Sequence, residues 1–101
     1  MKSNQINPNK ANTRAVLKEF QTIPSVGPKT AQDLYGLGFR RIRELANADP
    51  DKMYRRLCRN GPIDRCMLYV FRCAVYFARE TRHDPELLKW WNWTDEKMSG
   101  R

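Results

Sequence analysis

The sequence predicts an all-α fold of five to six helices, and two observations carry this prediction. Apolar residues recur at intervals of three and four along most of the 101-residue chain, which is the spacing of one helical face. No segment shows the sustained alternation of apolar and polar residues that is typical of a half-buried strand. The length and the 41% of hydrophobic residues suit a single globular domain.

The first helix is expected to start near Asn12 or Thr13, because either side chain could cap it. A polar tail over residues 1–11 precedes it, and we expect this tail to be disordered. Pro24 ends the helix, since the residue before a proline is disfavoured in the helical region. The apolar residues at helical spacing are Val16, Leu17, Phe20 and Ile23.

The second helix is expected to open at Pro28, in the first turn, where the missing N–H costs nothing. Gly36 and Gly38 end it. The segment RRIRELAN, residues 40–47, follows as a short connector helix with Ile42 and Leu45 facing inward. The inner face of the second helix consists of Ala31, Leu34, Tyr35 and Leu37.

Asp49 and Pro50 form the clearest helix start in the chain, since Asp49 can cap the helix and Pro50 suits its first position. Asn60-Gly61 ends this helix, and Pro62 is expected to open the next one.

That next helix, over about residues 63–82, is apolar on nearly every side, which is typical of a helix that others surround. Asp84-Pro85 repeats the cap and starts a last short helix through ELLKWW, residues 86–91. The domain then occupies residues 12–93, and residues 94–101 form a polar tail.

The chain carries 19 Lys and Arg residues against 11 Asp and Glu residues, a formal net charge of +8. Residues 1–65 hold 13 basic and 6 acidic residues, a net charge of +7, whereas residues 66–101 hold 6 and 5. Such a charge favours a polyanionic partner, although it also serves solubility.

The longest apolar run, CMLYVFRCAVYFA, is too short and too charged to span a bilayer. The first ten residues lack the apolar core of a secretory signal, and three cysteines suggest reduced thiols. We therefore expect a cytoplasmic protein that does not enter a membrane.

Two segments of the chain are similar to each other. VGPKTAQDLY and NGPIDRCMLY are offset by 34 residues, with Gly, Pro, Leu and Tyr at matching positions. Each match lies at an equivalent point of a helix, tight turn, helix unit. The connector helix lies between the two units.

The segment IPSVGPKTAQDLYGLGF, residues 23–39, resembles the helix-hairpin-helix motif of DNA-repair and recombination proteins. Two such units around a connector resemble the compact paired, SAM-like form of that fold. From about Val16 to Trp93 the chain also resembles a small bacterial family described as pathogenicity locus or mitomycin-resistance proteins. The segments DRCMLYVFRCAVYFA and LLKWWNW carry this second resemblance.

Anion binding is the physical reason for such a hairpin, because a helix N-terminus has unpartnered N–H groups and a partial positive charge. The expected donors are the amides of Gly27, Lys29 and Thr30, helped by the Thr30 hydroxyl and the Lys29 charge. Ser25 stands where the motif has its first glycine. The resemblance implies that two hairpins straddle the minor groove of double-stranded DNA and bind its backbone without sequence preference. An accessory role in DNA repair, recombination or uptake would follow.

The second hairpin, RNGPIDR, departs from the motif, because it lacks the Lys-Thr pair and places Asp64 where phosphate would bind. Arg59 and Arg65 could compensate, but we expect this hairpin to be weaker or structural. Further arginines could extend a basic track: Arg41, Arg43, Arg55 and Arg56. The candidate nucleic-acid-binding residues are Ser25, Val26, Gly27, Lys29, Thr30, Arg40, Arg59, Gly61 and Arg65.

The sequence also allows functions other than DNA binding. A protein-interaction module or homodimer would keep the fold without the phosphate contacts. Asp49, 20 residues after Lys29, has the spacing of a glycosylase pair, but helix capping explains it, and we expect no enzyme activity.

We also expect no metal and no cofactor. Cys66 and Cys73 would lie about 10 Å apart along one helix, too far to share an ion. The tryptophans could stack on unpaired bases, yet their spacing favours packing in the core: Trp90, Trp91 and Trp93.

Overall fold

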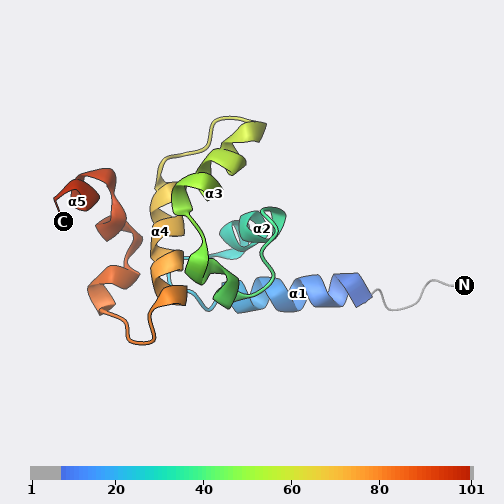
Figure 1. The fold of residues 1–101 in the computed structure, drawn as a ribbon. Helices are drawn as coiled ribbons and strands as arrows, with labels where there is room; N and C mark the ends of the chain where they lie inside the picture. The colour runs from blue at the N-terminus through green and yellow to red at the C-terminus, as the bar shows by residue number, and fades with distance from the viewer. Residues whose placement is uncertain (1–7, 101) are drawn as a thin grey trace, which may run out of the picture.

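The computed structural model describes residues 8–100, with side chains from residue 12 onward. These residues form helices joined by turns and contain no strand, so the predicted all-α fold is confirmed. The α-helices are α1 (Pro8–Phe20), α2 (Pro28–Gly36), α3 (Pro50–Leu57), α4 (Cys66–Arg79) and α5 (Asp95–Ser99) (Figure 1). The short 3-10 helices are η1 (Ile42–Asn47), η2 (Cys58–Asn60), η3 (Pro85–Leu88) and η4 (Trp90–Trp93).

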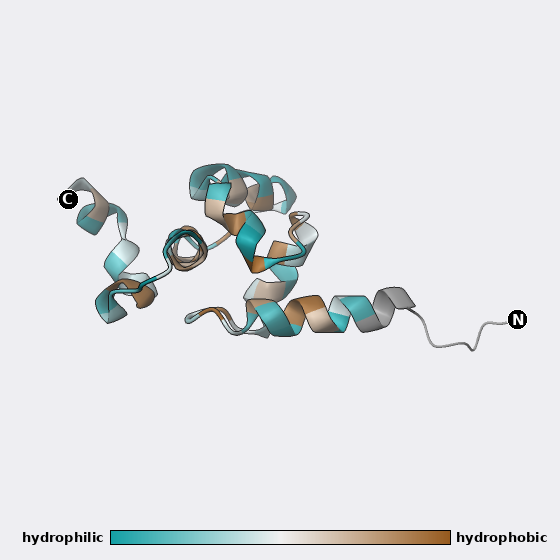
Figure 2. Ribbon diagram, turned by 60° about the horizontal axis from the view of Figure 1, so that its bottom comes forward, coloured by the Kyte–Doolittle hydropathy of each residue, from teal (hydrophilic) through white to brown (hydrophobic). Residues whose placement is uncertain are grey.

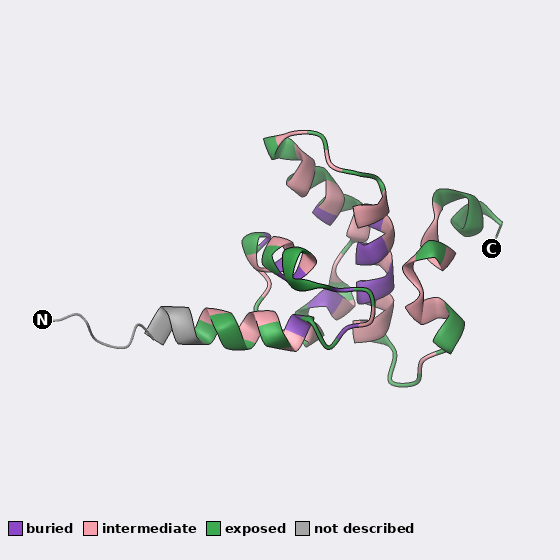
Figure 3. Ribbon diagram, turned by 180° about the vertical axis from the view of Figure 1, so that it is seen from behind, coloured by how far each residue is buried: buried purple, intermediate pink, exposed green. Residues whose placement is uncertain are grey.

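Helix α4 is the central element, as its apolar sequence predicts. Leu68, Phe71 and Ala74 are fully buried in it, and it packs against η1, α3 and η4. Figure 1 shows α1, α2 and α3 on one side of α4 and the C-terminal segment on the other. Figure 3 shows buried turns along the middle of α4.

The N-terminal part of the chain supplies the rest of the core. Phe20, Ile23, Leu34 and Leu45 are fully buried and join one cluster with α4. Burying each such side chain contributes about 1.5–3 kcal/mol before the entropy of ordering is subtracted. In Figure 2, hydrophobic and hydrophilic residues alternate along α1, as in a helix that packs with one face.

The start of α1 differs from the prediction. The helix begins at Pro8, which suits its first turn, so Asn12 and Thr13 lie inside it and do not cap it. The Thr13 hydroxyl lies 3.0 Å from the Tyr35 hydroxyl instead. Of the tail expected over residues 1–11, residues 1–7 lie outside the described residues and residues 8–11 belong to α1.

The start of α4 also differs, because Pro62 does not open it. Residues 61–65 are not helical, and α4 runs only from Cys66 to Arg79. The Tyr54 hydroxyl donates a 2.6 Å hydrogen bond to the Ile63 carbonyl, which holds this segment against α3. The Asp64 side chain then accepts a hydrogen bond from the Cys66 amide.

The two Asp-Pro helix starts are confirmed. The Asp49 carboxylate accepts from the amides of Asp51 and Lys52, at 2.9 and 3.4 Å. The Asp84 carboxylate accepts from Glu86 at 3.0 Å.

The C-terminal segment has more structure than the sequence suggests. The expected last helix is two 3-10 helices, η3 and η4. Within residues 94–101, expected to be a polar tail, the chain forms α5, with the Thr94 hydroxyl accepting a hydrogen bond from the Lys97 amide.

Candidate nucleic-acid interface

The turn between α1 and α2, residues 21–27, is attached to the rest of the protein through Val26 and Ser25. Val26 is buried, and its amide donates to the Ile23 carbonyl at 3.1 Å. The Ser25 hydroxyl donates to the Leu88 carbonyl at 3.3 Å. The Val26 side chain therefore points inward, whereas Ser25 is exposed and its hydroxyl is hydrogen-bonded to Leu88, so this turn offers mainly backbone groups to a ligand.

Ser25 has a φ of +77°, in the left-handed region that a glycine adopts without cost. The motif that this segment resembles has a glycine at this position, and the backbone conformation gives the physical reason. Serine here is strained by roughly 1–2 kcal/mol.

The N-terminus of α2 is open. Gly27 is its N-cap, in an extended conformation and without a side-chain cap. Its carbonyl accepts the first helical hydrogen bond, from Ala31 at 2.9 Å. Within residues 8–100 no acceptor pairs with the amides of Gly27, Lys29 and Thr30. A β-carbon added to Gly27 would meet nothing within 4 Å, so space remains for a ligand to approach the backbone.

Two side chains flank this N-terminus. The Lys29 side chain is 79% exposed, and its Nζ lies 2.8 Å from Oδ1 of Asp33, one turn along the helix. The Asp33 side chain is only 12% exposed, so the lysine is the mobile partner of this pair, and its ammonium group is open to an incoming phosphate. The Thr30 hydroxyl instead contacts the Met67 sulfur of α4 at 3.9 Å, so only the Thr30 amide faces the helix N-terminus.

The corresponding N-terminus of α4 is occupied. The Cys66 amide donates to Oδ1 of Asp64 at 2.9 Å, and the Met67 amide donates to the Asp64 carbonyl at 3.0 Å. The Cys66 amide holds the pKa of the Asp64 carboxyl below its usual range. A carboxylate of the chain itself thus takes the place of an anion.

Arg65, beside this turn, is engaged as well. Its Nε and Nη2 donate to the two Asp95 oxygens at 2.9 and 3.1 Å, and Tyr69 and Arg72 also donate to Asp95. These donors, Arg65 foremost, hold the pKa of the Asp95 carboxyl well below its ordinary value. The Arg65–Asp95 pair joins residues 30 positions apart, so no local pattern in the sequence could have revealed it.

Arg40 and Arg41 lie at the other end of α2. The Arg40 Nη1 donates to the carbonyls of Tyr35 and Phe39 at 2.9 and 3.0 Å, and its guanidinium lies 3.6 Å over the Tyr35 ring. The Arg41 Nε lies 3.4 Å from Glu19. Arg40 thus stabilises the C-terminal end of α2, Arg41 pairs with α1, and both remain exposed.

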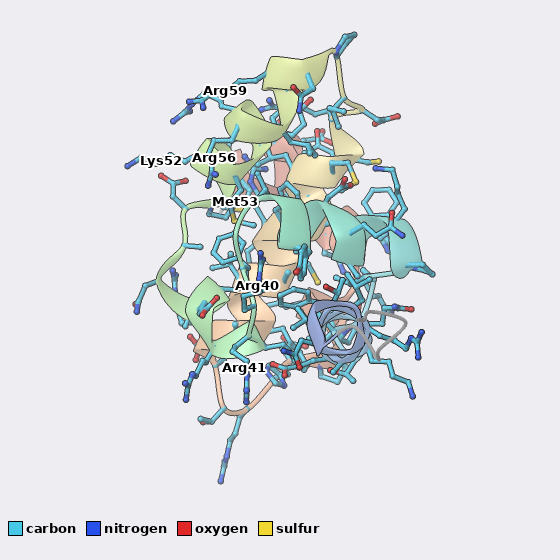
Figure 4. The ribbon with its side chains drawn as sticks, turned by 90° about the vertical axis from the view of Figure 1, so that its right-hand side faces the viewer. Arg40, Arg41, Lys52, Met53, Arg56 and Arg59 are labelled. Carbon is cyan, nitrogen blue, oxygen red and sulfur yellow. The ribbon has the colours of Figure 1, made fainter. Side chains whose placement is uncertain are left out.

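The outer side of α3 and η2 carries four exposed cations on two successive turns, which we name the α3 face: Lys52, Arg55, Arg56 and Arg59. Met53 lies on the inner side and is 3% exposed. Figure 4 shows Lys52, Arg56 and Arg59 along one side of the molecule, with Arg40 and Arg41 lower in the same view. None of the four forms an ion pair with a residue that the structure describes.

The nucleic-acid-binding residues predicted from the sequence include Arg59 of the α3 face but not Lys52. The signal was present, because positions 52, 55, 56 and 59 share one helical face.

The cysteines and most of the tryptophans take structural positions. Burial raises the pKa of the Cys73 thiol to about 11, and Cys58 and Cys66 are separate free thiols. Between residues 12 and 100 no group of side chains could hold a metal ion. Trp90 stacks on Tyr69, with ring centroids 6.5 Å apart, whereas Trp91 is 53% exposed.

Comparison with known proteins supplies a family. No curated protein and no solved structure matches the chain significantly. No helix in the described part of the chain has the length and apolarity to cross a bilayer. The family model Cdd1, described as pathogenicity locus, matches residues 13–99, which include both turns, the central helix and the C-terminal segment. The chain therefore belongs to the Cdd1, or pathogenicity-locus, family.

Proposed function

We propose that this protein binds double-stranded DNA without sequence preference, through backbone phosphates held at the N-terminus of α2. The helix, turn, helix units formed by α1 with α2 and by α3 with α4 would then be helix-hairpin-helix units. The observation that carries this proposal is the open α2 N-terminus, with its three unpartnered amides at Gly27, Lys29 and Thr30. The formal net charge of +8 supports a polyanionic ligand.

The chemistry of this site suits a phosphate group. The phosphate oxygens accept hydrogen bonds from the free amides, and the partial positive charge at the start of α2 stabilises them. Gly27 leaves room for the phosphate. The Lys29 ammonium group leaves the Asp33 carboxylate and binds the phosphate instead. None of these contacts reads a base, so binding is independent of sequence. An accessory role in DNA repair, recombination or uptake agrees with the motif that the segment resembles.

The test is DNA binding by Gly27→Val/Lys29→Ala, measured by fluorescence anisotropy with a short duplex across a salt series. Gly27 has an extended backbone that valine also adopts, and a β-carbon there would meet no atom within 4 Å. We expect an affinity loss of about tenfold or more and a shallower salt dependence, because phosphate contacts are removed.

The matched control is Thr81→Val/Arg82→Ala, which makes comparable changes at two exposed positions in the loop after α4. It should bind like the wild type, and circular dichroism should show all three proteins folded. Equal loss in both variants, or no binding by the wild type, would contradict the proposal. The latter result would favour a protein-interaction module, for which the 53% exposed Trp91 is the contact to examine.

A further inference from the structure

The charges of the α3 face are unusual because nothing in the described structure neutralises them. Like charges three and four residues apart on a helix repel one another and destabilise it. Arg55 and Arg56 recover part of this energy by lying near the negative C-terminal end of α3. The acidic residue of this helix, Asp51, has its carboxylate 3.8 Å from Arg72 of α4. None of the four cations of the α3 face is thus committed to an ion pair within the described structure, and their charge is available to a partner.

The α3 face adjoins the helix that begins the proposed phosphate site. Arg56 and Arg59 line a groove of about 330 Å³ together with the second half of α2, from Gln32 to Leu37. Asp33, the partner of Lys29, also lines this groove. The open amides and the groove arginines thus lie toward opposite ends of one nine-residue helix, about 13 Å long. One phosphate cannot reach both places, whereas a nucleic-acid backbone with repeated phosphates can.

The second turn, between α3 and α4, is a poor candidate for a second contact with the nucleic-acid backbone. Its helix N-terminus is filled by Asp64, and Arg65 is paired with Asp95. The C-terminal side of the molecule offers little net charge, since residues 66–101 hold 6 basic and 5 acidic residues. Helices α2 and α3 lie on the same side of α4 (Figure 1), and Lys52, Arg56 and Arg59 lie together along one side of the molecule (Figure 4).

We propose that the second contact with the DNA backbone is made by the α3 face and not by the second turn. This inference rests on the proposed function. It specifies, in addition, where the duplex lies on the protein. A backbone runs from the N-terminus of α2 along the groove to the α3 face. The α3 face supplies most of the salt-dependent part of binding, and the second turn serves to hold α3 against α4.

The test compares two triple variants of the full chain on the same duplex. The first, Lys52→Gln/Arg56→Gln/Arg59→Gln, removes three charges of the α3 face. The second, Arg82→Gln/Lys89→Gln/Lys97→Gln, removes three charges from the C-terminal side and is the matched control. We expect the first variant to bind about tenfold more weakly or worse, with a slope of log affinity against log salt shallower by about 2 to 3. The control should stay within about twofold of the wild type.

A second readout separates binding from damage to the fold. Removing repelling charges should leave the melting temperature of the α3-face variant unchanged or raise it, so weaker binding with undiminished stability supports the inference. Equal slopes in the two triple variants would overturn it. If Gly27→Val/Lys29→Ala binds the duplex normally while the α3-face variant does not, the phosphate site at α2 is refuted and the contact through the α3 face is supported. Absence of duplex binding by the wild type overturns both.

Discussion

The two turns of this protein, before α2 and before α4, contain the same Gly-Pro dipeptide, but only the first leaves the following helix N-terminus open. Gly27-Pro28 and Gly61-Pro62 lie 34 positions apart. In the first, Gly27 has a φ of −96° and Pro28 starts the helix, which leaves the amides free. In the second, Gly61 has a φ of +134°, Pro62 lies outside the helix, and α4 starts only at Cys66.

The residues after the dipeptide explain the difference. Lys29-Thr30 in the first turn brings no carboxylate to the helix N-terminus, and the Thr30 hydroxyl contacts the Met67 sulfur instead. Ile63-Asp64 in the second turn provides a carbonyl for Tyr54 and a carboxylate for Cys66. A glycine and a proline before a helix therefore do not by themselves leave the helix N-terminus open; that depends on whether the chain supplies its own carboxylate there.

Gly→Ala substitutions in the two turns should show the largest contrast in stability. Gly61 has a φ of +134° and a ψ of 171°, a conformation almost reserved for glycine, so Gly61→Ala should cost roughly 1–3 kcal/mol. Gly27→Ala should cost less than about 1 kcal/mol, because its φ and ψ are ordinary. Urea denaturation measures both, and equal losses would refute the comparison.

Ser25 allows a finer test within the first turn. Ser25→Gly and Ser25→Ala both lose the hydrogen bond to Leu88, but only glycine relieves the left-handed φ of +77°. We therefore expect the glycine variant to be more stable than the alanine variant by about 1 kcal/mol. Thermal melts of the two variants, side by side, check this, and an alanine variant as stable as the glycine one would exclude backbone strain here.

The smallest expected effect is a change in DNA affinity when the Asp64 carboxylate is removed from the second turn. Asp64→Ala removes the carboxylate and frees the Cys66 amide, so DNA affinity should rise about two- to fivefold. Asp64→Asn keeps an acceptor but loses the charge, and it should fall between the wild type and the alanine variant. Unchanged affinity in Asp64→Ala would mean that the carboxylate does not keep phosphate away.

The pH dependence of stability provides the control for Asp64. Folding lowers the pKa of this carboxyl, so its contribution is complete above the ordinary pKa of about 3.9 and is lost as pH falls through the lower folded value. Asp64→Asn should lack this component in melts recorded between about pH 5 and pH 2.

Much of the fold could be predicted because its signals are local. Asp49-Pro50 and Asp84-Pro85 cap their helices as expected, since a cap involves only neighbouring residues. The apolar stretch around Phe71 identified the central helix by composition alone. The free amides at Gly27, Lys29 and Thr30 follow equally from the position of Pro28.

The sequence by itself thus determined the all-α class, the central helix, the starts of α2, α3 and η3, and the open N-terminus of α2. Only the tertiary structure decided that Pro62 stays outside α4, that Arg65 is paired with Asp95, and that Ser25 faces Leu88. The reason is distance along the chain: Arg65–Asp95 spans 30 residues and Ser25–Leu88 spans 63. No local pattern encodes such contacts, because they form only when packing around α4 brings the segments together.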